Sequence, residues 1–338
     1  MTDVPVFVIA EAGVNHNGDI ALAHRLVDAA ADAGADAVKF QTFRADRVAG
    51  AETPKAAYQK ETTDAAESQL DMLRKLELPW EAHAALKRQC DERNIEFMST
   101  PFDPDSADFL VETGIRRFKT GSGELTNLPF LEHAARHGLP MILSTGMATL
   151  EEIGDAVEAV RKAGAGEISL LHCVSNYPAA PEDTNLRAMQ KMAEAFDVPV
   201  GLSDHTMGIA VATGAAALGA SIIEKHFTLD RTMTGPDHLA SIEPDGLKQM
   251  VDAIRTVTAA LGDGEKRPAE SERENRVLVR RSLVAACDIA AGEILADDMI
   301  DAKRPGDGLP PAMRSALVGR RANRDILSGA QFAMEMFD

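Results

Sequence analysis

The chain has 338 residues, of which 45% are hydrophobic and 26% charged, and its formal net charge at pH 7 is −18. This composition is ordinary for a folded globular protein, and the length allows two or three domains. The negative charge disfavours a nucleic-acid surface or an anionic membrane as partner, because both would be repelled. An acidic chain that takes an acidic substrate must gather its basic side chains locally.

The cysteine pattern and the N-terminal segment bear on the compartment. Cys90, Cys173 and Cys287 lie far apart without a CxxC pair, which favours a reducing compartment over a disulfide framework. The N-terminal segment lacks the basic and apolar regions of an export signal, and no apolar run reaches the roughly 20 residues that span a bilayer. We therefore expect a cytoplasmic protein without a membrane-spanning segment.

Eight short apolar runs recur along the chain with helical stretches between them. Each run begins apolar and ends on polar residues or glycine, which is typical of a buried parallel strand emerging at its carboxyl end. Eight such strands alternating with helices predict an α/β fold of the (β/α)8 TIM-barrel type. A doubly wound open sheet is the alternative, but no GxGxxG follows the first run. The runs are 6–13, 37–43, 96–102, 117–124, 140–146, 168–174, 198–205 and 221–227.

The pattern changes after a helical stretch at about 244–261, where a charged segment with glycine and proline follows. We therefore predict a catalytic barrel domain over 1–262, a linker over 263–280 and a small C-terminal domain over 281–338. The last segment has short apolar runs broken by glycine, proline or charge, so we expect a compact, turn-rich domain. At this size folding alone is marginal, and the domain should lean on the barrel or on a second subunit.

Residues 44–79 form an unusually long connection between the second and third runs. A polar stretch with Tyr58 is followed there by a leucine-rich helical pattern. An insertion after a barrel strand is often part of a lid or substrate loop, and a plain surface excursion is the alternative. The sequence leaves both open.

Two of the predicted strands end on a histidine, His205 in one and His226 in the next. Because the carboxyl ends of neighbouring parallel strands lie on one face, the two imidazoles can converge on one ion. Two nitrogen ligands leave coordination positions open, which favours a catalytic metal over a structural one. Two buried histidines capped by backbone groups are the alternative.

Lysines and hydroxyl groups stand at other strand ends. A lysine inside a buried strand, such as Lys39 or Lys119, needs a counter-charge or an anionic ligand. Internal pairs, Lys39–Glu11 or Lys119–Glu124, are one alternative, and a Schiff-base lysine at position 119 is another. Beside the histidines and hydroxyl groups, the two lysines favour a substrate that carries a phosphate and a carboxylate.

Eight segments, in chain order, carry a resemblance to a known family. They are IAEAGVNHNG, AVKFQTF, STPFD, KTGSGE, ILSTGM, GLSDHT, EKHFT and KRPGDG. They resemble the signature segments of the sialic acid (N-acetylneuraminate) synthase family, whose members join a (β/α)8 barrel to a C-terminal SAF domain similar to type III antifreeze proteins. The resemblance covers essentially the whole chain.

The resemblance implies an enzyme, a transferase of carbohydrate biosynthesis that forms a carbon–carbon bond. Such enzymes condense phosphoenolpyruvate with an open-chain N-acetylated amino sugar, release phosphate by C–O cleavage and form a nine-carbon 2-keto acid. They use a divalent metal, Mn2+ or Mg2+. N-acetylmannosamine, which gives N-acetylneuraminate, is the first expectation for the sugar. A diacetamido-trideoxyhexose, which gives legionaminate or pseudaminate, is the alternative.

The resemblance also implies roles for individual residues. His205 and His226 match the metal ligands, and we expect Glu11, Glu124 and His226 to take part in catalysis, with either glutamate stabilising charge or positioning water. The positions that match contacts to phosphoenolpyruvate are Lys39, Thr100, Lys119, Ser122, Ser144 and Ser203. Those around the sugar and the reacting carbons are Glu11, Gln41, Tyr177 and Asp237.

Two features concern the variable end of the sugar. Arg304 matches an arginine that the family's small domain supplies to the N-acetyl group from the partner of a domain-swapped homodimer. After the sixth strand, sialate-forming members carry CTNxYP, whereas this chain places Ser175 where the asparagine stands and Asn176 one position later. The serine can still donate to a phosphate oxygen, so we keep it as a substrate-binding residue. A phosphorylated-sugar aldolase and a sugar- or ice-binding module on an inactive barrel are the remaining alternatives.

Overall fold

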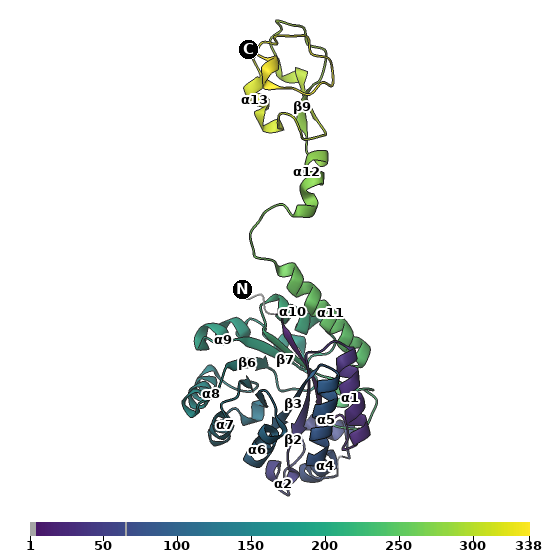
Figure 1. Ribbon diagram of the computed structural model, residues 1–338, viewed down its shortest axis with the longest axis vertical. Coiled ribbons are helices and arrows are strands. Elements are labelled where there is room, and N and C mark those ends of the chain that lie inside the picture. The colour runs from purple at the N-terminus through teal and green to yellow at the C-terminus, as the bar shows by residue number, and fades with distance from the viewer. Residues whose placement is uncertain (1–4, 65) are drawn as a thin grey trace. The chain divides into compact units, whose positions relative to one another are not determined.

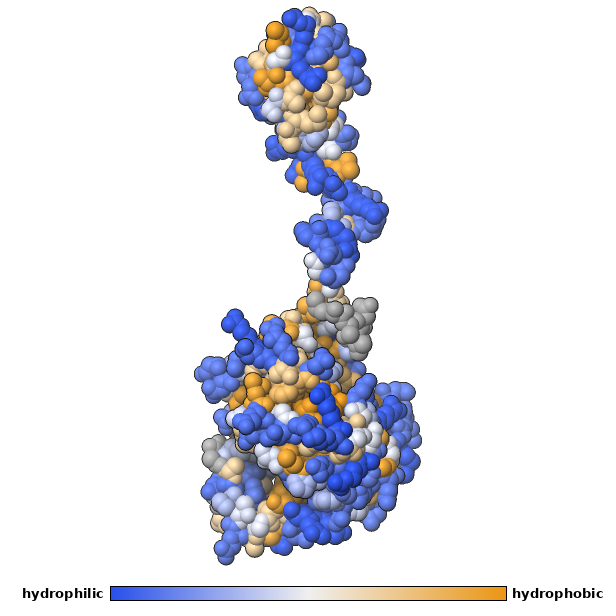
Figure 2. Space-filling model, turned by 90° about the vertical axis from the view of Figure 1, so that its left-hand side faces the viewer, coloured by the Kyte–Doolittle hydropathy of each residue, from blue (hydrophilic) through white to orange (hydrophobic). Residues whose placement is uncertain are grey.

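The structure is a computed structural model that describes residues 5–64 and 66–338. It divides into two compact units, Met1–Asp263 and Gly264–Asp338 (Figure 1). On the face seen in Figure 2, hydrophilic side chains cover most of the surface, in keeping with the charge of the chain. Within the described residues, no helix combines the length and the apolar character needed to cross a membrane.

The first unit is a sheet of eight parallel strands surrounded by helices (Figure 1). The strand order is β3-β2-β1-β8-β7-β6-β5-β4, and β3 also contacts β4, so the sheet curls into a near-closed barrel. This confirms the predicted (β/α)8 fold. The strands are β1 (Phe7–Gly13), β2 (Ala37–Thr42), β3 (Glu96–Pro101), β4 (Phe118–Thr120), β5 (Met141–Ser144), β6 (Ile168–Cys173), β7 (Val200–Asp204) and β8 (Ile222–His226).

The helices follow local capping signals. Helix α8, for example, begins after Thr149, which exchanges hydrogen bonds with Glu152 in a capping box, and ends at Gly164 with φ +100°. The helices of the barrel layer are α1 (Ile20–Asp32), α5 (Trp80–Glu92), α6 (Pro104–Thr113), α7 (Leu128–Ala135), α8 (Leu150–Ala163), α9 (Ala188–Phe196), α10 (Ala210–Ala217) and α11 (Pro244–Leu261).

The strands build two different cores, because alternate residues point into the barrel and out toward the helices. The outward side chains pack with the helices in the large core. The inward side chains form a small apolar floor at one level of the barrel interior, and polar residues take the next inward positions toward the carboxyl ends. The floor consists of Ile9, Ala37, Met98, Ile142, Leu171 and Ile222.

One predicted strand is much shorter than expected. The run 117–124 forms a strand only over Phe118–Thr120, and Ser122–Glu124 make a 3-10 turn, η1, directly after Gly121. The expectation that the strand continues to Glu124 is therefore wrong. Gly121 precedes this turn and Gly123 lies within it, and both glycines disfavour a continued strand.

The second unit has its own small core. An antiparallel pair, β9 (Ser282–Ala285) and β10 (Ile300–Lys303), is accompanied by the short helices α12 (Arg273–Val279) and α13 (Arg314–Leu317). The rest of the unit is made mostly of turns, as its glycines and prolines predict. The core residues are Leu283, Ala285, Ile289, Leu295, Ile300, Leu317, Ala322, Ile326, Phe332 and Phe337.

Candidate active site

A cavity of about 490 Å3 opens at the carboxyl ends of the barrel strands. In a (β/α)8 barrel this is the face that carries the active site. The cavity brings together all but two of the residues that the sequence indicated. Those that line it are Glu11, Lys39, Gln41, Thr100, Lys119, Ser122, Ser144, Ser175, Tyr177, Ser203, His205, His226 and Asp237.

A buried charge cluster lies at the base of the cavity. Lys39 Nζ lies 2.7 Å from Glu11 Oε2 and donates a hydrogen bond to Thr100 Oγ1 at 2.8 Å. Glu224 lies between the two lysines, with Oε2 3.7 Å from Lys39 Nζ and Oε1 3.2 Å from Lys119 Nζ. The Lys39–Glu11 pair was one of the two anticipated pairs, whereas Lys119 pairs with Glu224 and not with Glu124. Both ammonium groups still line the cavity, so an anionic ligand can reach them.

The two carboxyl groups of this cluster have opposite environments. Burial raises the pKa of Glu11 to about 7, although Lys39 acts against this shift. Burial also acts to raise the pKa of Glu224, but Lys119 and Lys39 together hold it at about 2. Glu224 is therefore a fixed negative charge at neutral pH, whereas Glu11 can exchange a proton there. A pair with such different pKa values suits acid–base work beside an anion.

Glu224 was assigned no catalytic or binding role from the sequence. It stands two positions before His226 on β8, and residues two apart in a strand point to the same face. The intervening Lys225 points away from the cavity and pairs with Asp204 Oδ2 at 2.6 Å. Because side chains in a strand alternate between its two faces, counting two residues back from His226 could have identified Glu224 in the sequence.

The two histidines lie close enough to share a ligand, with ring centroids 5.3 Å apart. His205 Nδ1 donates to the carbonyl of Val174 at 2.7 Å, which leaves the lone pair of Nε2 free in the neutral ring. His226 Nδ1 is buried without a hydrogen-bond partner among the described residues, 3.5 Å from Asp237 Oδ2. Burial and the neighbouring His205 hold the pKa of His226 well below its usual value, so its imidazole is neutral. These features fit a divalent metal.

Hydroxyl groups at the ends of β4, β6 and β7 also line the cavity. Ser122 Oγ accepts a hydrogen bond from the backbone N–H of Gly146 at 2.9 Å. A Cβ at Gly146 would lie 2.2 Å from Ser175 Oγ and 2.8 Å from Ser122 Oγ, so a larger residue there would displace these hydroxyl groups. Ser203 Oγ, on β7, donates to Glu224 Oε1 at 2.9 Å. Hydroxyl and backbone donors so placed can bind phosphate or carboxylate oxygens.

The insertion after β2 supplies one wall of the cavity. Its helices are α2 (Ala45–Val48), α3 (Ala57–Thr62) and α4 (Gln69–Leu76). The ring of Tyr58 stacks on Tyr177 with centroids 5.1 Å apart, and Tyr177 lies 4.1 Å from the ring of His205. The insertion is therefore part of the site, which favours the lid or substrate-loop hypothesis over a plain surface excursion.

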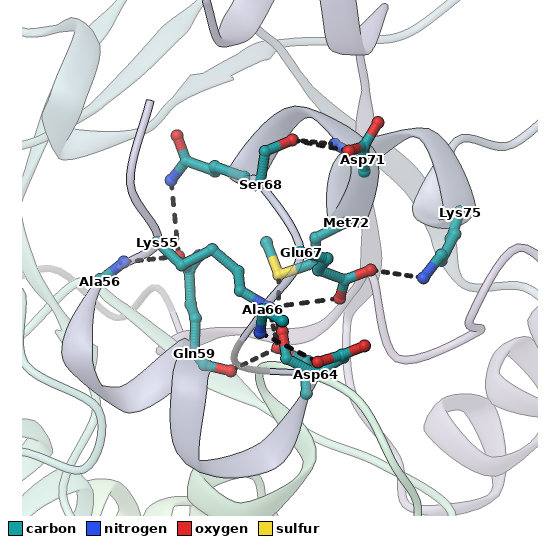
Figure 3. A network of polar contacts seen from close by, with 12 residues as sticks. Lys55, Ala56, Gln59, Asp64, Ala66, Glu67, Ser68, Asp71, Met72 and Lys75 are labelled. Atoms are coloured by element: carbon teal, nitrogen blue, oxygen red, sulfur yellow. Dashed lines mark hydrogen bonds and ion pairs between the residues drawn. The ribbon is translucent and has the colours of Figure 1, made fainter. Parts of the chain in front are cut away.

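A buried lysine holds the insertion in place (Figure 3). Lys55 Nζ donates to Thr63 Oγ1 at 2.7 Å and to the carbonyl of Asp64 at 2.5 Å, and lies 3.2 Å from Glu67 Oε1. Glu67 also pairs with Lys75 on α4. Because the side chain of Lys55 is fully buried, these contacts satisfy an ammonium that has no access to water. The segment that carries Tyr58 is thus tied to α4.

Two predicted site residues lie elsewhere. Glu124 is not among the described residues that line the cavity, because the chain turns into η1 after β4, and its carboxylate accepts a hydrogen bond from Asn127 Nδ2 at 2.7 Å. Arg304 is exposed on the second unit, where its Nε donates to the carbonyl of Val279 at 3.0 Å. It remains a predicted contact to the sugar.

The fold and the cavity define the class, a (β/α)8-barrel protein with a charged cavity at its mouth and a small C-terminal domain. The NeuB family model matches residues 26–266, and the SAF domain model matches residues 280–338. The chain belongs to the NeuB family. The family resemblance seen in the sequence is thereby confirmed, and the chain is an enzyme of the sugar-acid synthase type.

Three named relatives align with almost the whole chain. The N,N'-diacetyllegionaminic acid synthase of Legionella pneumophila is 47% identical, over 97% of this chain and 94% of that protein. The enzyme of that name from Campylobacter jejuni is 49% identical, over 94% of this chain and 96% of that protein. The human N-acetylneuraminate-9-phosphate synthase is 36% identical, over 94% and 88% of the two chains.

A solved structure gives the same family. The N-acetylneuraminic acid synthetase of Leptospira borgpetersenii, determined in complex with citrate, superposes with a TM-score of 0.71 at 39% identity. The match covers 80% of this chain and 90% of that one. The similarity to the two legionaminic acid synthases is greater, so the comparisons favour the diacetamido alternative over the first expectation of N-acetylmannosamine.

Proposed function

We propose that the protein condenses phosphoenolpyruvate with the open-chain form of a 2,4-diacetamido-2,4,6-trideoxyhexose and releases N,N'-diacetyllegionaminate and phosphate. The observation that carries the phosphoenolpyruvate half is the pair of buried ammonium groups, Lys39 and Lys119, on the wall of a cavity lined with hydroxyl groups. The sugar half rests on the 47–49% identity to the two diacetyllegionaminic acid synthases.

The charge balance of the cavity supports an anionic substrate. Lys39, Lys119, Glu11 and Glu224 are all nearly inaccessible to water. With Glu11 titrating near neutral pH, the two lysines outweigh the one permanently ionised carboxylate. A phosphate and a carboxylate would compensate that excess, and Ser122, together with its neighbouring hydroxyl groups, would supply the remaining donors.

His205 and His226 would hold the divalent metal, Mn2+ or Mg2+. When bound there, such an ion would polarise the aldehyde oxygen of the sugar and make its carbon more electrophilic. Asp237 lies beside His226, and burial raises its pKa to about 6, so it is mostly ionised at neutral pH and adds negative charge next to this pair.

The chemistry of the remaining residues follows from the charge cluster. Carbon 3 of phosphoenolpyruvate attacks the aldehyde carbon, the C=O bond becomes a single bond whose oxygen takes up a proton, and positive charge develops at carbon 2. Glu224, ionised throughout the neutral range, stabilises that charge. Glu11, with a pKa of about 7, accepts a proton from the water that adds at carbon 2. The tetrahedral carbon then loses phosphate by C–O cleavage, while the two lysines stabilise the departing anion.

We place the variable end of the sugar against the wall formed by Tyr58, Tyr177 and Gln41. The two aromatic rings offer an apolar surface for acetamido methyl groups, and Gln41 offers amide donors and an acceptor. Arg304 would approach the same end from the partner subunit of a domain-swapped homodimer. The sugar therefore contacts a different part of the cavity than phosphoenolpyruvate does.

The test is phosphate release from phosphoenolpyruvate with a panel of sugars, with and without Mn2+. We expect kcat/KM for the diacetamido sugar of the legionaminate series to exceed that for N-acetylmannosamine by about tenfold or more, which corresponds to about 1.4 kcal/mol of transition-state binding. The epimeric diacetamido sugar of the pseudaminate series is the matched control. A preference for N-acetylmannosamine would overturn the choice of sugar while leaving the reaction type in place.

A further inference from the structure

A second group of metal-ligating side chains lies outside the barrel mouth, on two adjacent outer helices. Asp108 stands in the middle of α6, His133 lies in the last turn of α7, and His137 follows two residues after the end of that helix. One ligand atom from each of these three residues lies within 4.8 Å of the other two. None of the three lines the cavity at the barrel mouth.

The three side chains converge on one point. Asp108 Oδ1 accepts hydrogen bonds from His133 Nε2 at 2.7 Å and from His137 Nε2 at 2.8 Å. A carboxylate oxygen only accepts, so both imidazoles present an Nε2–H to it. An ion can take the place of these two protons, because a tautomer shift to Nδ1–H frees both Nε2 lone pairs.

The geometry needs only a small adjustment to become a coordination site. In a tetrahedral site with bonds of about 2.0–2.2 Å, ligand atoms stand roughly 3.4 Å apart. The nitrogen–oxygen distances would therefore widen by about half an ångström. The side chains can make this movement, since those of His133 and His137 are 31% and 27% exposed and that of Asp108 is 49% exposed. Water also reaches the group and can supply a fourth ligand.

Helix geometry explains why these residues meet. His133 lies in the last turn of α7, and His137 follows four residues later, just beyond the end of the helix, where the chain keeps its imidazole beside that of His133. Helix α6 packs against α7, and Asp108 faces that pair. Hydrogen bonds between partly exposed side chains contribute little stability by themselves, whereas an ion held by all three would join the two helices.

We propose that Asp108, His133 and His137 bind a transition-metal ion of the zinc class, with water as the fourth ligand, and that this ion joins α6 to α7. Two imidazoles and a carboxylate suit Zn2+, Co2+ or Ni2+ better than Mg2+ or Ca2+, which prefer all-oxygen sites. The site is independent of the pair at the barrel mouth and of the reaction proposed there.

The test starts from a variant that lacks the two histidines at the barrel mouth. The full-length His205→Ala/His226→Ala variant, stripped of metal, is titrated with Zn2+ at pH 7.5 by calorimetry. We expect one Zn2+ per chain in this background, and we expect adding His133→Gln and His137→Gln to weaken the affinity by about 100-fold or more. The matched control adds His24→Gln, at a partly buried histidine of α1 that hydrogen-bonds Gln89, and should bind Zn2+ like the background.

Thermal unfolding gives a second readout that distinguishes loss of the site from loss of the fold. Zn2+ should raise the Tm of the background protein and leave the Tm of the His133→Gln/His137→Gln form unchanged, because only a ligand bound to the folded state stabilises it. The metal-free forms should have similar circular dichroism spectra. Absence of Zn2+ binding in the background, or equal binding after both substitutions, would overturn the proposal.

Discussion

At the scale of single residues, Glu224 is the side chain on which the charge balance of the barrel mouth depends. It is the ionised partner of Lys119, and it also approaches Lys39. A buried ammonium that loses its counter-charge destabilises a protein by roughly 3–5 kcal/mol. Replacement of this one carboxylate should therefore make the fold depend on an external anion.

The first prediction concerns Glu224→Gln. Without ligand, its free energy of unfolding should fall by about 3 kcal/mol, because Lys119 is left unpaired. Phosphoenolpyruvate should raise the Tm of this variant more than that of the wild type, because the substrate supplies the missing negative charge. Thermal unfolding with and without the ligand measures both effects. Glu132→Gln, which removes a surface carboxylate 3.5 Å from Arg136, is the control and should change little. An equal or smaller Tm increase in Glu224→Gln would contradict an anion site beside Lys119.

The second prediction concerns His16 and pH. Its ring is fully buried, its Nδ1 accepts from the N–H of Gly18 at 3.0 Å, and its Nε2 lacks a hydrogen-bond partner among the described residues. Burial lowers its pKa to about 4. The unfolded chain takes up this proton near pH 6.5, so His16 contributes stability above that pH, and the contribution is lost as the pH falls toward 4.

The stability that is lost through His16 reaches about 2 kcal/mol at pH 5, because each pKa unit corresponds to about 1.36 kcal/mol. His16→Asn keeps an acceptor for Gly18 and removes the titrating ring. Urea unfolding at pH 7.5 and pH 5 should therefore show a smaller loss of stability at pH 5 in the variant than in the wild type, by about that amount. An identical loss in both proteins would show that His16 does not titrate as the structure implies.

At the scale of elements, the sequence predicted the strands well because each has a simple local signal. An apolar run that ends on polar residues identified β1 and β8, and strand ends placed Lys39, His205 and His226 on one face. Local patterns could place Glu224 on the cavity face of its strand but could not pair it with Lys119, because the two residues are far apart in the sequence and meet only when the barrel closes. The error at Glu124 came from extending β4 beyond Gly121.

The role of the insertion after β2 could not be predicted from local sequence patterns either. Its polar composition did not distinguish a wall of the cavity from a surface loop, because the distinction rests on long-range contacts. Tyr58 reaches Tyr177, and Lys55 binds groups on three later residues of the insertion. Neither contact has a signature in the local sequence.

The third prediction therefore concerns Lys55→Met. This change keeps an unbranched apolar side chain and removes the ammonium that ties the insertion together (Figure 3). Loss of these buried hydrogen bonds costs about 1–3 kcal/mol and loosens the wall that carries Tyr58. KM for the sugar should rise by about tenfold, while KM for phosphoenolpyruvate should change little. Lys162→Met, at an exposed pair with Glu158, is the control. A rise in both KM values would point to a general loss of structure instead.

At the scale of the whole molecule, the residues that line the cavity belong to the first unit, whereas Arg304 belongs to the second. Each unit has a core of its own. Arg304 is the residue of the second unit that we expect at the sugar, and the family resemblance implies that it comes from a partner chain. The fourth prediction tests whether two subunits build one site.

Arg304→Ala and His226→Ala should each have very low activity alone, with a folded structure by circular dichroism. When the two variants are unfolded and refolded together in equal amounts, half of the dimers should be mixed, and one site in each mixed dimer should combine an intact barrel with an intact Arg304. Activity should therefore return to about one quarter of the wild-type value. A mixture as inactive as its components would show that Arg304 acts within its own chain or not at all.

The fate of the bridging oxygen of phosphoenolpyruvate tests the central claim most directly. Phosphoenolpyruvate labelled with 18O between carbon 2 and phosphorus is incubated with the protein, Mn2+ and the diacetamido sugar. The masses of both products are then measured by mass spectrometry. Carbon–carbon bond formation with C–O cleavage predicts that the label leaves entirely in phosphate and that a nine-carbon 2-keto acid forms without it. Label retained in the keto acid, or loss of activity when borohydride reduces a Schiff base on Lys119, would contradict the account.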